Sequence, residues 1–195
     1  PAPLITAEPE PKGERRAVVE FDAAPSLSLG WLTVPKGQRD GYALDVLARI
    51  LGGLASSRLD KTIVQEERLA SNVGCYHDAR RFGGYLSVTA YAQPGHTVAE
   101  LEAAVDREIG KIRDAGVTAE ELERAKIRAE IGRVRSLKSN LGQAFRVGDA
   151  VGLAGTPDYL YEYEAKLNAV TAADVQAAAK KYLDPARKCV VEVRK

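Results

Sequence analysis

The chain reads Leu51-Gly-Gly-Leu-Ala-Ser-Ser-Arg-Leu59 between two helical patterns. Residues 40–51 carry leucines at helical spacing, and Gly52-Gly53 predicts the end of that helix, because glycine favours the conformations that stop a helix. A second short helix is predicted from Ser56 or Ser57 to Glu67. Far downstream the chain adds a capped helical pattern, Val170-Thr-Ala-Ala-Asp-Val-Gln-Ala-Ala-Ala-Lys-Lys-Tyr-Leu183.

Strand patterns lie on both sides of this stretch and at the end of the chain. In one of them Leu86, Val88 and Ala90 alternate with Ser, Thr and Tyr, which is typical of a strand with one buried face. Pro25 separates the first two strands, and Arg81-Phe-Gly-Gly84 predicts a hairpin turn. The predicted strands are 16–22, 26–34, 72–80, 84–92 and 188–194.

Helical patterns fill most of the second half, and three of them open with a capping box, in which Thr and an acidic residue three positions later satisfy free backbone N–H groups. The second box opens a long helical region, 118–153, with a kink near Gly132 or Gly142. Thr156-Pro157 predicts another helix start, since a cap residue precedes a proline in the first turn. The boxes are Thr97-Val-Ala-Glu100, Thr118-Ala-Glu-Glu121 and Thr171-Ala-Ala-Asp174.

The predicted order is two strands, two helices, two strands, four helices and a final strand. This order favours an α+β two-layer sandwich, a mostly antiparallel sheet with helices packed on one face, over a doubly wound nucleotide-binding fold. Residues 1–13 hold Pro1, Pro3, Pro9 and Pro11 and are predicted to be a linker, with 14–195 as a single domain. The absence of methionine suits a segment of a longer chain.

Composition excludes two classes of partner. The 28 basic and 27 acidic residues nearly cancel, so the chain lacks the excess positive charge of an electrostatic nucleic-acid binder. The longest apolar runs are too short to cross a membrane.

Two cysteines, Cys75 and Cys189, cannot build a disulfide framework, and two buried small hydrophobes are favoured over a disulfide or a reactive thiol.

The sequence carries no recognisable catalytic motif. His77 and His96 are the only histidines, and neither belongs to an H-x-x-E-H or H-E-x-x-H cluster. Cys75 and His77 share a strand face, but without a second cluster an ordinary pair of hairpin residues is favoured over a metal site. No G-x-S-x-G and no phosphate-binding loop is present. We therefore predict no catalytic residue and no metal ligand in this chain.

A run of basic residues between 124 and 138 invites a phosphate-binding interpretation. Glutamates interleave with it, so a solvated helix face with i,i+4 ion pairs is favoured. The basic residues are Arg124, Lys126, Arg128, Arg133, Arg135 and Lys138.

Taken in order, these elements resemble one repeat of the pitrilysin/insulinase-type zinc peptidases, which include the mitochondrial processing peptidases and bacterial relatives. The resemblance covers residues 14–195. It implies a LuxS/MPP-like half fold of the non-catalytic, C-terminal type, which forms the wall of a substrate chamber. The zinc ion and its H-x-x-E-H motif are expected in a partner half, in the same polypeptide or a separate subunit. This chain alone is expected to hold no cofactor and to cleave nothing.

In active members of the family, the second repeat supplies an Arg and a Tyr that hold substrate. The same alignment places Val64 and Ser71 at these positions here. A donor beside a developing oxyanion contributes about 3 kcal/mol, and valine supplies none. The candidates left for substrate contact are Gly52, Gly53, Ser57, Arg58, Arg68, Tyr76 and Arg80. For Arg58 a capping or salt-bridging role is an equal alternative.

Two interpretations stay open at this point. The first is the non-catalytic half of a zinc endopeptidase that acts on peptides captured as an added strand. The alternative is a scaffold or binding protein that kept the fold and lost proteolysis, which the substitutions at 64 and 71 favour. The family resemblance further suggests a periplasmic location, and an isolated repeat of this kind could pair with itself as a homodimer.

Overall fold

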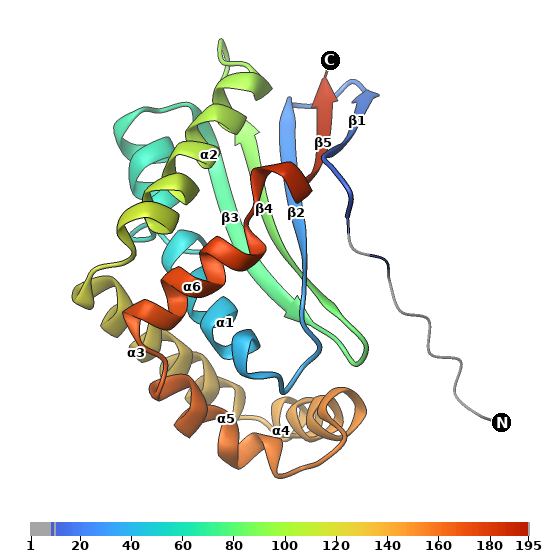
Figure 1. Ribbon diagram of the computed structural model, residues 1–195, viewed down its shortest axis with the longest axis vertical. Helices are drawn as coiled ribbons and strands as arrows, with labels where there is room; N and C mark the ends of the chain where they lie inside the picture. Colours follow the sequence, from blue (N-terminus) through green and yellow to red (C-terminus); the bar gives the residue numbers. More distant parts are fainter. Residues whose placement is uncertain (1–8, 10, 195) are drawn as a thin grey trace, which may run out of the picture.

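The computed structural model describes residue 9 and residues 11–194, in which five strands form one sheet (Figure 1). The strand order is β1-β5-β2-β4-β3, and every neighbouring pair is antiparallel except β1 and β5. The mostly antiparallel sheet is therefore confirmed. The strands are β1 (Arg15–Glu20), β2 (Ser26–Thr33), β3 (Ala70–Ala79), β4 (Gly84–Ala92) and β5 (Cys189–Arg194).

Helices cover one face of this sheet, so the predicted α+β two-layer sandwich is confirmed (Figure 1). The α-helices are α1 (Arg39–Leu51), α2 (Val98–Ala115), α3 (Ala119–Ser136), α4 (Asn140–Asp149), α5 (Tyr159–Asn168) and α6 (Ala172–Tyr182). Two π-helical turns, η1 (Asp60–Glu66) and η2 (Ala150–Ala154), and a 3-10 turn, η3 (Pro185–Arg187), complete the elements. None of the described helices is long and apolar enough to cross a membrane.

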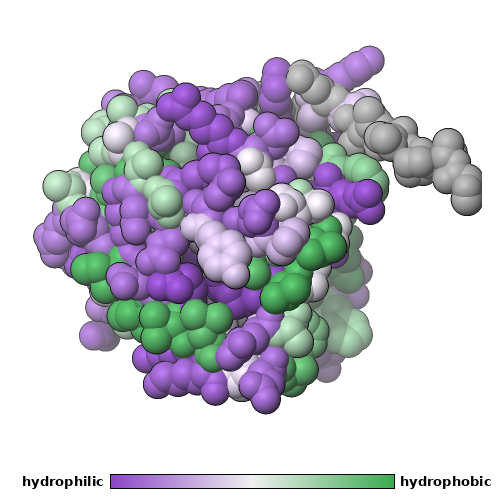
Figure 2. All heavy atoms as spheres, turned by 90° about the horizontal axis from the view of Figure 1, so that it is seen from below, coloured by the Kyte–Doolittle hydropathy of each residue, from purple (hydrophilic) through white to green (hydrophobic). Residues whose placement is uncertain are grey.

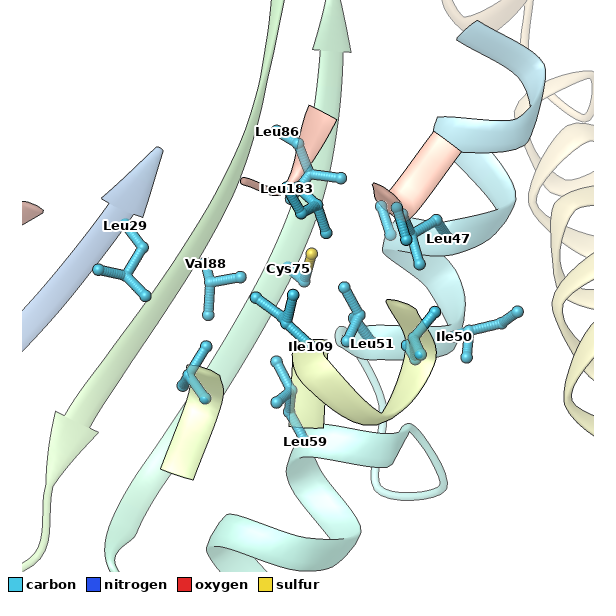
Figure 3. Close-up of a cluster of buried hydrophobic side chains, with 14 of the residues drawn as sticks. Leu29, Leu47, Ile50, Leu51, Leu59, Cys75, Leu86, Val88, Ile109 and Leu183 are labelled. Carbon is cyan, nitrogen blue, oxygen red and sulfur yellow. The ribbon is translucent and has the colours of Figure 1, made fainter. Parts of the chain in front are cut away.

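The core lies between the sheet and the helices. On β2, Leu27, Leu29 and Trp31 are buried while the residues between them are not, which is the alternation of a strand with one covered face. In Figure 3, Leu29 of β2 and Val88 of β4 point towards Ile109 of α2, with leucines of α1 beside them. Burial of these side chains supplies most of the free energy that holds the two layers together.

The three predicted capping boxes are confirmed at the starts of α2, α3 and α6. In each, the threonine side chain accepts from the backbone of the acidic residue three positions later, whose carboxylate accepts from the threonine N–H. These local signals fixed helix starts correctly because both partners lie within one turn.

The region predicted to be helical over 118–153 is mostly helical, but the kink predicted near Gly132 or Gly142 is a full break that divides it into two helices. The chain leaves α3 after Ser136 and begins α4 at Asn140, because the Ser139 side chain accepts a hydrogen bond from Gly142 N at 3.0 Å and caps a new helix. Gly132 lies inside α3 without a break, and the break falls just before Gly142. The region continues past α4 as the π-helical turn η2.

Two other helix predictions need correction. The Thr156-Pro157 step lies outside α5, because the Thr156 hydroxyl accepts from Asp158 N at 3.2 Å and forms a turn before the helix begins at Tyr159. The short helix predicted after the two glycines is present, but most of it is the wider-wound π-helical turn η1. Hydrophobic spacing does not distinguish an α-helix from a π-helix over so few residues.

The prediction of two buried cysteines is half right. Cys75 on β3 is buried in the core, and Cys189 at the start of β5 is exposed. Both thiols are free among the described residues. Cys189 alternates with buried Val190 and lies on the uncovered face of the sheet, which the sequence pattern alone did not reveal. Most of the predicted linker, 1–13, lies outside the described residues.

Gly52 and Gly53 end α1 for two different reasons. A Cβ built on Gly52 would lie 2.6 Å from Cys75 Cβ and closer still to the Cys75 backbone nitrogen, so only glycine lets the end of α1 approach β3. Gly53 has a φ of 96°, a region that side-chain-bearing residues rarely adopt. This close approach brings the α1 C-terminus against the middle of β3.

An ion-pair network joins the parallel strands β1 and β5 to α2. Glu102 accepts from Arg16 Nη2 at 2.8 Å and from Lys188 Nζ at 2.7 Å, and its side chain is only 14% exposed. Lys188 also contacts Asp106 at 2.6 Å. These contacts lower the pKa of Glu102 from the ordinary 4.5 to about 2. The hydrogen bond from Arg16 has the larger effect and the hydrogen bond from Lys188 adds to it.

This network predicts a loss of stability in acid. A carboxyl group whose pKa is lowered by folding contributes stability above its unfolded pKa, and loses it as pH falls from about 4.5 towards 2. We expect a contribution of about 1–2 kcal/mol at neutral pH after solvent screening. Urea unfolding at a series of pH values should show Glu102→Gln less stable than wild type at pH 7 and equal to it in strong acid. Parallel pH profiles for the two proteins would contradict this role.

Candidate functional site

A cavity of about 420 Å³ opens between α1, β3, α3, α4 and α5. Asp45 and Arg49 reach it from one face of α1, since residues four apart share a helix face. His77 borders it from β3, and Tyr159 and Tyr163 from α5. Elements from both halves of the sequence thus build one concave site.

A buried hydrogen-bond network forms one wall of this cavity. His77 Nδ1 lies 2.7 Å from Asp45 Oδ1, and His77 Nε2 lies 3.0 Å from the Thr33 hydroxyl. The Tyr163 hydroxyl donates to Asp45 Oδ2 at 2.7 Å. Because a carboxylate only accepts, Nδ1 carries the proton of a neutral His77 and Nε2 accepts from Thr33. The network ties β2, β3, α1 and α5 together around one carboxylate.

The tyrosines of the cavity are held in the neutral, donating form. Burial raises the pKa of Tyr163 far above its ordinary value, and the neighbouring Asp45 carboxylate raises it further. Tyr159, half-buried beside it, has its pKa raised by the same two causes in the same order. Neither phenol acts as a base here, so their function is to donate hydrogen bonds and to present a ring surface.

The residues of this wall do not fit a zinc ion. A ligating histidine must offer one ring nitrogen to the metal, and both nitrogens of His77 are engaged by Asp45 and Thr33. Cys75, on the same face of β3, is buried, and burial raises the pKa of its thiol, which opposes the thiolate that binds metal. Within the described part of the chain no three His, Cys, Asp or Glu residues gather in a way that could hold a metal ion.

The basic run on α3 is only partly the solvated face that the sequence predicts. Arg124 forms the expected i,i+4 ion pair with Glu120 at 3.3 Å. Arg128 instead turns into the cavity, where it donates to the Arg49 carbonyl at 3.5 Å and to the Ser56 hydroxyl. Arg133 also borders the cavity and pairs with Glu164 at 2.9 Å. The interleaved glutamates favoured a solvated face along the whole run. That prediction was wrong in part because the charge pattern of a helix does not show which of its faces packs against another element.

Three of the predicted substrate-side residues lie together. Gly52, Gly53 and Tyr76 border a second cavity of about 330 Å³, which shares Asp45, Arg49, His77 and Arg128 with the first. The two cavities therefore adjoin beside α1, where Arg49 and Arg128 border both, and together they are called the hollow beside α1. A role in substrate contact for the three remains a prediction.

The next two predicted residues, Ser57 and Arg58, lie between the glycine pair and η1. Arg58 makes a two-pronged contact with Glu121 of α3, at 2.9 Å from Nε and 2.6 Å from Nη2, which is the salt-bridging alternative. Ser57 is buried and its hydroxyl has no hydrogen-bond partner among the described residues. The Arg58 contact fastens the segment between α1 and η1 to α3, and both side chains lie outside the two cavities described above.

Arg68 and Arg80 are not brought to the hollow beside α1. Arg68 is exposed in the turn before β3, with a φ of 56°. Arg80 follows β3 at the hairpin tip and pairs with Asp78 at 2.6 Å. At the two substituted positions, Val64 packs against the core and the Ser71 hydroxyl donates to the Tyr91 carbonyl at 3.3 Å. Neither of these last two offers a charged donor to a ligand.

Sequence reasoning missed the residues that dominate the cavity. Asp45 lies in a helix that is otherwise apolar on its buried face, with Arg49 one turn later, and this pair was the available signal. Tyr163 is 118 positions from Asp45, so no local pattern could reveal their contact. Arg146 of α4 was hidden in the region predicted to be one long helix.

Comparison with known proteins places this chain in a family. The sequence matches the peptidase M16 inactive domain over residues 1–128. It is 30% identical over 155 residues to the Bacillus subtilis protein named uncharacterized zinc protease YmxG, covering 79% of this chain and 37% of that protein. It is 26% identical over 168 residues to zinc protease PqqE of Helicobacter pylori, covering 84% of this chain and 38% of that protein.

Among solved structures, a protease from Helicobacter pylori superimposes with a TM-score of 0.91 at 23% identity, covering 97% of this chain and 46% of that one. The chain thus spans less than half the length of these relatives. The resemblance to pitrilysin/insulinase-type zinc peptidases is confirmed. Because the family match covers more than half of the chain, this protein belongs to the peptidase M16 inactive domain family.

Proposed function

We propose that this chain is the metal-free half of a zinc endopeptidase and forms the chamber wall opposite a zinc-bearing half. The observation that carries the proposal is the match to an inactive peptidase domain whose relatives are named zinc proteases. The chain spans 37% and 38% of those relatives, which leaves length for a second half of similar size. The donor set around His77, which does not fit zinc, supports a metal in the other half.

Exposed apolar side chains supply a surface for that partner half. On α3, Ile127, Ile131 and Val134 are each about half exposed, and on α4 Leu141 and Phe145 are about two-thirds exposed. Seen from the end of the molecule where α4 and α5 lie, apolar groups gather between hydrophilic ones (Figure 2). Apolar patches of this kind mark contact surfaces, and the remaining length of the relatives provides an occupant.

Peptides are the substrates that the sheet can accept. β3 is the last strand of the sheet, so its outer edge pairs with no other strand among the described residues. An open edge binds an extended peptide as an added strand through backbone hydrogen bonds. Such capture depends little on sequence and suits an endopeptidase of unfolded chains.

Metal content tests the division of labour. We expect the purified chain to carry no stoichiometric zinc after dialysis, and its complex with the zinc-bearing half to carry one zinc per pair, measured by atomic emission. The chain is not expected to retain zinc because His77 has no free ring nitrogen. Tight, stoichiometric zinc on the isolated chain would overturn the proposal.

The alternative is a scaffold or binding protein that no longer takes part in proteolysis. Val64 and Ser71 favour it, because they replace the Arg and Tyr that hold substrate in active members of the family. This alternative expects the complete pair to bind peptides without cleaving them. Peptide turnover by the pair therefore separates the two functions.

A further inference from the structure

We propose that the cavity between α1, β3, α3, α4 and α5 binds a carboxylate group of a peptide; that the ligand is a peptide rests on the proposed function. The charges that line the cavity carry this inference. The lining cations are Lys36, Arg49, Arg128, Arg133 and Arg146, and the lining carboxylates are Asp45, Asp78 and Asp149.

All three carboxylates of the lining are already engaged. Asp45 accepts from His77 and Tyr163, and Asp78 pairs with Arg80 at 2.6 Å. Asp149 lies 3.8 Å from Lys36 Nζ. With Arg133 paired to Glu164, two of the five cations have acidic partners, and the other three have none among the described residues.

The three remaining guanidinium groups contact only neutral oxygens. Arg49 donates to the Asp45 carbonyl at 2.7 Å, and Arg128 to the Arg49 carbonyl and the Ser56 hydroxyl. Arg146 donates to the Ser136 hydroxyl at 3.3 Å. Within the described residues, no carboxylate oxygen lies within 4.0 Å of these three groups. Half-buried like charges repel one another, and a bound anion relieves that repulsion.

Arginine is also the side chain best suited to a carboxylate. Its planar guanidinium offers two parallel N–H groups that match the two oxygens of the anion. The three arginines come from α1, α3 and α4, so a ligand in the cavity is contacted from three sides. Their neutral hydrogen bonds fix each side chain near the cavity without cancelling its charge.

Size and apolar lining match part of a peptide. The volume of about 420 Å³ admits a small part of a peptide, and Ala79, Ala129, Leu160 and the Tyr159 ring provide surface for its carbon atoms. The carboxylate comes from either of two sources, the peptide's C-terminus or an Asp or Glu side chain. Both present the same group to the arginines.

Peptide binding to the purified chain tests the inference directly. Fluorescence anisotropy would compare four labelled alanine-rich peptides: one with a free C-terminus, one amidated with an internal Glu, one amidated with Gln, and one amidated with phosphoserine. We expect at least one carboxylate peptide to bind at least about tenfold more tightly than the Gln peptide, with the preference falling as salt rises. The first two peptides distinguish the two sources of carboxylate.

Charge-removing variants locate the binding. Arg128→Gln and Arg146→Gln are each expected to reduce the carboxylate preference about tenfold or more. Arg124→Gln is the matched control, because it removes the same charge one turn away on α3, outside the cavity. Thermal unfolding of each variant checks that the chain still folds. Arg146→Gln is the variant expected to disturb the fold least, because among the described residues the Arg146 side chain makes one hydrogen bond.

Several outcomes overturn the inference. If neither the free-C-terminus peptide nor the Glu peptide binds more tightly than the Gln peptide, including the case in which none of them binds, the cavity is not a carboxylate site. Equal losses in Arg124→Gln and Arg128→Gln place binding elsewhere. Tighter binding of the phosphoserine peptide than of both carboxylate peptides assigns the cavity to phosphate. A complex that cleaves neutral peptides while the chain shows no carboxylate preference retains the proposed function and overturns this inference alone. If the chain prefers carboxylate peptides but the complex cleaves no peptide, the inference is retained and the proposed function is overturned.

Discussion

Replacing Gly52 with alanine is expected to lower the free energy of unfolding by about 3 kcal/mol, because the added methyl group meets backbone that cannot move aside. The new Cβ would lie 2.6 Å from Cys75 Cβ and 3.0 Å from Cys75 Cα. Cys75 lies in the middle of the edge strand β3 and is held there by its pairing with Val88 of β4. Relief therefore requires the end of α1 to move away from β3, which opens the core and the hollow beside α1.

Gly74→Ala is the matched control for this prediction. It adds the same methyl group one residue before Cys75, where a built Cβ meets nothing within 4 Å. We expect its effect to stay within about 0.5 kcal/mol. Urea unfolding followed by circular dichroism measures both variants. Equal stability of Gly52→Ala and wild type would show that α1 does not pack on β3 as closely as the structure places it.

Replacing Asp45 with alanine is also expected to lower the free energy of unfolding by about 3 kcal/mol, but for a different reason. Two buried donors, His77 Nδ1–H and the Tyr163 hydroxyl, lose their acceptor at once. A buried donor left without a partner costs about 1–3 kcal/mol. The His77 side chain is only 1% exposed, so water cannot replace the carboxylate there without a local rearrangement.

Asp45→Asn separates the lost hydrogen bonds from lost volume. The amide keeps an oxygen that accepts from His77 Nδ1–H and offers an N–H₂ group to the Tyr163 oxygen. We therefore expect the free energy of unfolding to fall by only about 1 kcal/mol. Thermal and urea unfolding should rank wild type above Asn and Asn above Ala. If Asn and Ala are equally destabilised, the charge of Asp45 matters more than its contacts. If neither is destabilised, the network contributes nothing to stability.

The fold was predictable where its signals are local. Each capping box joins two residues within one helical turn, and the alternation along β2 and β4 reports directly which face is covered. The parallel pairing of β1 with β5 joins residues about 174 positions apart, as in Arg15 with Cys189, and no local pattern encodes it. The interruption before Gly142 was predicted only as a kink, because a capping serine such as Ser139 inside a helical pattern resembles an ordinary polar position.

The site was predictable only in its outline. The glycine pair pointed to the right region, since its close approach to β3 forms one border of the hollow. The charged residues of the cavity were not found, because Arg128 and Arg124 look alike in sequence and only the packing of α3 gives them different surroundings. A long-range carboxylate such as Asp45 becomes visible only when its partners from β3 and α5 are placed around it.

Peptide turnover with and without this chain tests the central claim most directly. The zinc-bearing half, at fixed concentration, would be titrated with this chain while cleavage of a quenched-fluorescent peptide is followed. We expect negligible cleavage by either component alone and a kcat/KM that rises with added chain and saturates near one chain per zinc-bearing half. A complex that forms, binds the peptide and leaves it intact would contradict the account and establish the scaffold role instead.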